Sequence, residues 1–156
     1  MKSAPALIAG FASLLLAVAA YGQGSPPGGG GPPGGVAGCS FDAGGITGLN
    51  FGTLDPSSGT IVTATATLMV GNCGAGRTMS LSIDNGRRGN RTMIRDGGNE
   101  LIAYSLSAPT FSPGTADGPG IGAYKPATFT GTVMPGAYMD AVAGVYRDLL
   151  VVTVTP

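Results

Sequence analysis

Apolar and polar side chains alternate along most of the chain after residue 38, and this period of two is typical of half-buried β-strands. The clearest stretch is 60–73, where one set of alternate positions is apolar and the other is mostly threonine. The apolar set is Val62, Ala64, Ala66, Leu68 and Val70. The pattern predicts strands at 39–42, 49–54, 60–73, 79–83, 91–94, 101–106, 128–134 and 145–155.

Turn-forming sequences separate these strands about every dozen residues. Residues 55–59, 84–86 and 96–98 combine Asp with Pro, Asn, Ser or Gly, and 109–126 is a long Gly/Pro loop. No segment has the pattern of a convincing amphipathic helix. Seven or so short strands with such turns predict an all-β sandwich rather than a barrel or a helical fold.

The last predicted strand, 145–155, reaches the end of the sequence. Leu150, Val152 and Val154 share one face, while Leu149, Val151, Thr153 and Thr155 share the other. A strongly β-prone strand with no partner after it risks leaving a sheet edge unpaired. We therefore expect a strand from another chain to complete this sheet.

The first residues predict export. Met1 and Lys2 give a short positive start, and an apolar run follows at 6–20, broken by Gly10 and Ser13. A transmembrane anchor is the alternative, but about 15 apolar residues fall short of the roughly 20 that span a bilayer. Small residues offer cleavage after Gly22 or after Ala20. Residues 1–22 are therefore predicted to be a secretory signal, and the protein to pass through the periplasm to the cell surface, a fimbria or the medium.

Residues 23–38 consist almost wholly of Gly, Pro and Ser, with Val36 as the one sizeable apolar residue. Such a sequence has too few apolar side chains to form a hydrophobic core, and it predicts a disordered or loosely extended linker. Glycine has no period of three here, which argues against collagen. The folded domain is then expected at 39–156, long enough for one sandwich and too short for two.

Two cysteines, Cys39 and Cys73, remain after the predicted signal. An oxidising compartment could join them without leaving an odd thiol. A metal pair or a catalytic thiol is the alternative. The chain has no histidine, so two thiolates would make a poor zinc site and a nucleophilic cysteine would lack its usual base. The sequence favours a disulfide.

The charge of the chain is nearly balanced. Eight basic residues face eight acidic ones, and Lys2 would leave with the signal, so the mature chain would carry a net charge of −1. Such a chain has no global attraction for nucleic acid or anionic membrane, and neither is expected as a partner. Low charge suits a surface that packs against copies of itself.

Several segments together resemble one known family. They are Cys39 at the domain start, Asn50-Phe51-Gly52-Thr53-Leu54, the Thr/Ala strand ending in Asn72-Cys73, Arg91-Thr92-Met93, Leu101-Ile102-Ala103-Tyr104-Ser105-Leu106, and the close from Gly144 through Tyr146 and Asp148 into alternating Val and Thr. In order and spacing they are similar to the spore coat protein U family, which includes the pilins of archaic chaperone–usher pili. The resemblance covers essentially residues 39–156.

The resemblance implies an incomplete immunoglobulin-like sandwich of about six or seven strands that lacks its last strand. A periplasmic chaperone would lend a strand, an outer-membrane usher would assemble the fibre, and a neighbouring subunit's N-terminal segment would replace the chaperone. Leu150, Val152 and Val154 are the expected lining of the donor-strand groove. Asp148 would have a structural role, serving a corner turn or capping backbone donors.

One departure from the family is the sequence just ahead of Cys39. A donor segment needs apolar residues at alternate positions, whereas prolines and glycines fill 26–38. The chain is thus expected to accept a strand without giving one, as a terminal subunit would, or to be a secreted coat-like relative that never polymerises.

Other functions find less support in the sequence. The carboxylates are Asp42, Asp55, Asp84, Asp96, Glu100, Asp117, Asp140 and Asp148, and most stand in turns; convergence of two of them into a catalytic pair stays open. Residues 84–86 and 96–98 lack the spaced oxygens of a calcium loop. No catalytic residue, metal or cofactor is expected.

The main rival is an adhesin or ligand-binding module. It would use the loop 109–126 or a group of arginines in one hairpin region: Arg77, Arg87, Arg88, Arg91 and Arg95. Clustered positive charge can attract an acidic partner, but no aromatic residues interleave to stack on bases.

Overall fold

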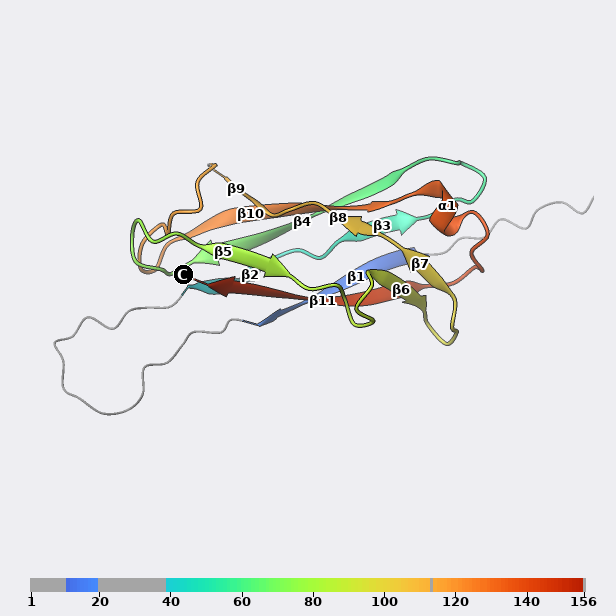
Figure 1. The fold of residues 1–156 in the computed structure, drawn as a ribbon, viewed down its shortest axis with the longest axis horizontal. Helices are drawn as coiled ribbons and strands as arrows, with labels where there is room; N and C mark the ends of the chain where they lie inside the picture. The colour runs from blue at the N-terminus through green and yellow to red at the C-terminus, as the bar shows by residue number, and fades with distance from the viewer. Residues whose placement is uncertain (1–10, 20–38, 113, 156) are drawn as a thin grey trace, which may run out of the picture.

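The computed structural model describes residues 11–19, 39–112 and 114–155, the first of these segments by its backbone. Two β-sheets form the two layers seen in Figure 1. The first has the order β3 (Asn50–Thr53), β1 (Phe11–Ala19), β11 (Tyr146–Thr155), β6 (Thr92–Arg95) and β7 (Leu101–Ala103), with β5 (Ser80–Ile83) also paired to β11. The second has the order β2 (Ser40–Ile46), β4 (Val62–Gly71), β10 (Tyr124–Val133) and β8 (Ser105–Leu106), with β9 (Thr110–Phe111) paired to β10.

The core lies between the two sheets and follows the alternation in the sequence. In β4 the side chains of Ala64, Ala66, Leu68 and Val70 are buried, and Val62 is half-buried. Strands β10 and β11 alternate in the same way. Burial of these apolar faces stabilises the fold by roughly 1.5–3 kcal/mol for each large side chain. The predicted all-β sandwich is confirmed.

The segment 101–106 differs from its prediction because it is two strands in opposite sheets. Strand β7 belongs to the first sheet and β8 to the second, so the chain crosses between layers at Tyr104. Ile102 and Tyr104 are buried and Leu106 is half-buried, so alternate positions face the core although the segment is not a single strand. The loop 109–126 also contains β9 and the first residues of β10.

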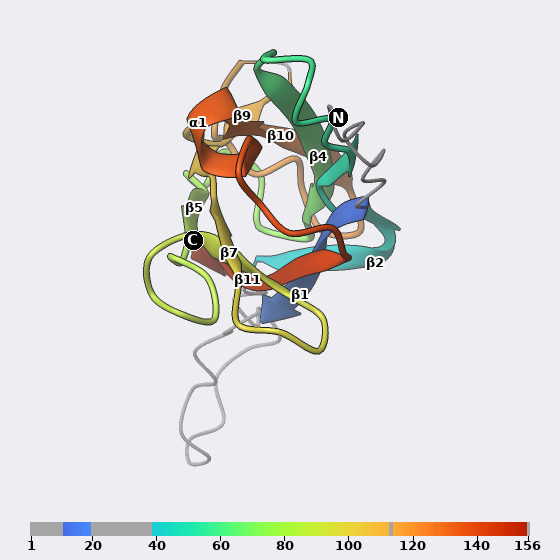
Figure 2. The same cartoon turned by 90° about the vertical axis from the view of Figure 1, so that its right-hand side faces the viewer.

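A single helical turn, α1 (Pro135–Tyr138), follows β10, at the end of the sandwich that faces the viewer in Figure 2. Four residues are too few to show the apolar period of a helix, so this turn was not predicted from the pattern. Its Pro135 begins the turn. Tyr138 is buried and its hydroxyl donates a hydrogen bond to the Thr60 carbonyl at 2.5 Å, which ties α1 to the start of β4.

The disulfide predicted between Cys39 and Cys73 is present, with a Cα–Cα distance of 4.5 Å. Cys39 immediately precedes β2 and Cys73 lies two residues beyond β4, the strand to which β2 pairs. The bond therefore fastens β2, at the edge of the second sheet, to its neighbour.

The apolar run expected to be the core of an export signal is β1 over residues 11–19. An apolar run of this kind fits both a signal segment inserted in a membrane and a buried β-strand, because both surroundings accept apolar side chains. The flanking residues 1–10 and the predicted linker at 23–38 lie outside the described residues. Within the described part of the chain, no helix has the length and apolar character needed to cross a membrane.

Candidate strand-acceptor site

The candidate site is the position in the first sheet between β3 and β11, which we call the acceptor site. Among the described residues these two strands do not pair with each other, and each pairs with β1 instead. Figure 1 shows β1 running beside β11 in the lower layer. The other edge of β11 is taken by β5 and β6. One edge of β11 is thus left for whichever strand occupies the acceptor site.

The pairing of β1 with β11 is parallel and regular. Residues 12–19 pair one by one with residues 146–153, without a register shift. On its other edge β1 pairs antiparallel with β3 at three positions, with a shift between Ala12 and Ser13. The acceptor site is therefore defined mainly by the backbone of β11.

The face of β11 that points into the core is the one carrying the predicted groove residues. Leu150, Val152 and Val154 are all fully buried, whereas Leu149 is 37% exposed. Paired positions on neighbouring strands lie on the same face of a sheet. The register sets positions 16 and 18 of β1 opposite Leu150 and Val152, and position 15 opposite Leu149.

Strand β3 is held against the second sheet by a close approach at Gly131. A Cβ added to this glycine would lie 2.7 Å from Phe51 Cζ and 2.9 Å from Leu49 Cδ1. Gly131 also pairs with Ala64, another small residue, in β4. The side chains of Leu49 and Phe51 fill the space beside Gly131, which holds β3 close to the second sheet.

Asp148 is a buried carboxylate near the start of β11, 6% exposed. Its Oδ1 accepts the backbone N–H groups of Arg87 and Leu149, and its Oδ2 accepts the hydroxyl of Tyr104 at 2.6 Å. Burial, followed by the hydrogen bond to Asp148 and its negative charge, raises the pKa of Tyr104. The expected role of Asp148 as a cap for backbone donors is confirmed.

Tyr146, the first residue of β11, bonds back to the chain that precedes it. Its side chain is buried, and its hydroxyl donates to the Val142 carbonyl at 2.6 Å. The same contact, from a tyrosine at the start of a late strand to backbone a few residues upstream, occurs in the tyrosine corner of immunoglobulin-like sandwiches. The contact fixes the angle at which the chain enters β11.

Comparison with known protein families identifies the domain. The model of the spore coat protein U domain matches residues 35–153. The chain belongs to the spore coat protein U family. A comparison with curated proteins finds no match. The resemblance seen in the sequence is thereby confirmed, and the family is one of structural coat-type and fimbria-type subunits at cell surfaces, which assemble with other subunits.

The matched part of this spore coat protein U chain begins after β1. Residues 35–153 contain β3 and nearly all of β11 but not residues 11–19. The strand that closes the first sheet thus comes from outside the family domain. The sequence singled out the face of β11, but it did not indicate that residues 11–19 match the acceptor site; Leu14, Leu16 and Val18 at alternate positions were the available signal.

The five arginines proposed as a ligand face have different surroundings in this domain. Arg77, Arg87 and Arg88 are exposed in loops. Arg95 binds Glu100 through two hydrogen bonds, of 2.7 and 3.1 Å, and this contact lowers the pKa of Glu100. The Nε of Arg91 is buried without a hydrogen-bond partner among the described residues. Their role in ligand binding stays a prediction.

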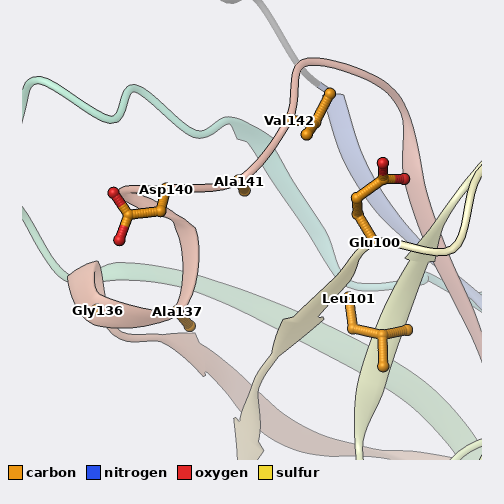
Figure 3. A pocket seen from close by; sticks show the side chains of 7 residues that line it. All are labelled: Glu100, Leu101, Gly136, Ala137, Asp140, Ala141 and Val142. Carbon is orange, nitrogen blue, oxygen red and sulfur yellow. The ribbon is translucent and has the colours of Figure 1, made fainter.

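A shallow cavity of about 310 Å³ lies between α1 and the start of β7. Its lining comprises Glu100, Leu101, Gly136, Ala137, Asp140, Ala141 and Val142. Figure 3 shows the Asp140 carboxylate pointing away from Glu100, which is itself bound to Arg95. These two carboxylates do not form a facing acid–base pair. In the described segments no group of three or more His, Cys, Asp or Glu residues is placed to hold a metal ion.

Proposed function

We propose that the protein is an exported structural subunit of a surface pilus or coat, and that it assembles by accepting a β-strand from another protein at the acceptor site. The observation that carries the proposal is the sheet order. Within the family domain, β3 and β11 are neighbours only through a strand that the domain does not contain. Strand addition at such a place gains main-chain hydrogen bonds along a whole strand, and the alternate apolar positions give it specificity.

The contacts of β11 support this function. Its buried residues Leu150 and Val152 face the core, so an unfilled acceptor site would expose part of that core to water. The tyrosine corner at Tyr146 supports an immunoglobulin-like arrangement. In such an arrangement the strand beside β11 would be the missing last one.

The disulfide supports the same function. A disulfide joins Cys39 and Cys73, as is usual for proteins of oxidising compartments. The predicted partners are a periplasmic chaperone that first fills the acceptor site, an outer-membrane usher, and neighbouring subunits. Residues 23–38 are expected to be a poor donor strand, which favours a terminal place in a fibre.

The test is a charge placed on the buried face of β11. Val152→Asp should abolish recovery of a soluble one-to-one complex with a candidate periplasmic chaperone, because the carboxylate would be buried beside the donated strand. Thr153→Asp is the matched control, since Thr153 is the half-buried neighbour on the opposite face. It should leave the complex intact.

The measurement is the mass of the complex after co-expression in an oxidising periplasm. Equal complex formation by wild type and both variants would contradict strand acceptance at β11. So would a chain without residues 1–22 that is monomeric in the absence of the chaperone and unfolds cooperatively at high temperature, because its sandwich would already be complete.

A further inference from the structure

Residues 11–19 have two incompatible uses in this protein. The sequence marks them as the apolar core of an export signal, which cleavage after Ala20 or Gly22 would remove. The structure uses the same residues as β1, the strand that fills the acceptor site. The uncleaved and the cleaved chain must therefore differ at this site.

We propose that the uncleaved chain is self-complemented: its own residues 11–19 occupy the acceptor site, and their removal opens the site to a partner's strand. This inference rests on the proposed function and adds its regulation. The signal segment then competes with the partner strand for the acceptor site, in addition to directing export.

The register of β1 supports a specific fit. Eight successive positions pair with β11 without a shift. The positions opposite buried Leu150 and Val152 are occupied by Leu16 and Val18, two large apolar residues. Any strand in this register needs apolar residues at the positions paired with the buried residues of β11, because polar residues there would be placed beside the hydrophobic core. The apolar sequence of residues 11–19 meets this requirement.

The connection also permits an intramolecular fit. Strand β1 ends and β2 begins at the same end of the sandwich in Figure 1. Residues 20–38 join them, and a chain of that length can span several tens of ångströms. With residues 23–38 as the flexible linker that the sequence predicts, a tethered strand would have an effective concentration on the order of 1 mM. A partner strand at about 1 μM would have to bind roughly a thousand-fold more tightly to displace it.

The experiment uses the full chain, refolded from denaturant under oxidising conditions so that residues 1–22 stay attached. Gly28, Gly29, Gly30 and Gly31 are replaced by a protease recognition sequence, and the connection is cut after folding. Native mass spectrometry then reports whether the N-terminal fragment stays with the domain. We expect it to stay bound, and to be displaced slowly by an excess of labelled peptide with the sequence of residues 11–19.

Two aspartate substitutions give a matched pair. Leu16→Asp should weaken retention of the fragment at least ten-fold, because position 16 lies opposite buried Leu150. Leu15→Asp should change retention less than two-fold, because position 15 lies opposite exposed Leu149. The same charge is added in both, so the difference reports the face of the strand.

Each other outcome overturns the proposal in a recognisable way. The wild-type fragment could be lost at once from a domain that still binds a nine-residue peptide of alternating Val and Thr. This result would reject self-complementation but would still support strand binding at the acceptor site. The same would follow from equal effects of the two aspartates. Loss of the fragment from a domain that binds no peptide and stays a stable monomer would reject the proposed function as well.

Discussion

At the scale of single residues, Tyr104 should make stability depend on alkaline pH. Its pKa is raised above the value of about 10 for an unfolded tyrosine, chiefly by burial. This stabilisation is complete below pH 10 and falls as the pH rises further, because the unfolded chain then loses a proton that the folded chain keeps. Tyr104→Phe should flatten that fall and cost about 1.5–3 kcal/mol at pH 7, since Asp148 loses a charged hydrogen bond. Urea unfolding between pH 7 and 11 measures both; an unchanged slope would contradict the assignment.

At the scale of elements, the contact of β3 with β10 should tolerate no side chain at Gly131. Gly131→Val should destabilise the domain by about 1–3 kcal/mol, because the new atoms overlap Phe51 and Leu49. Gly136→Ala in α1 is the control, since no atom lies within 4 Å of its added Cβ. Urea unfolding compares them, and equal stability of the two variants would show that β3 can move aside.

The strands show which elements the sequence could predict. Alternation places a residue on a face, so it identified the buried sides of β4 and β11 correctly. It does not say which sheet a strand joins, and for that reason the crossing at Tyr104 between β7 and β8 was missed. Nor does alternation show whether an apolar run such as residues 11–19 acts as a signal segment or as a buried strand, because both require apolar side chains.

At the scale of the whole molecule, the dependence of binding on salt distinguishes the two functions considered for this near-neutral chain. Strand addition at β11 depends on main-chain hydrogen bonds and apolar burial, which added salt barely weakens. Binding of an acidic partner by exposed arginines such as Arg87 and Arg88 would be screened at a Debye length of about 8 Å at physiological salt and about 3 Å at 1 M. We expect subunit or chaperone association to change less than about three-fold between 0.05 and 0.5 M NaCl in sedimentation velocity, because apolar contacts persist at these salt concentrations. A loss of ten-fold or more would favour the arginine surface, and Arg87→Ser with Arg88→Ser would then remove the salt dependence.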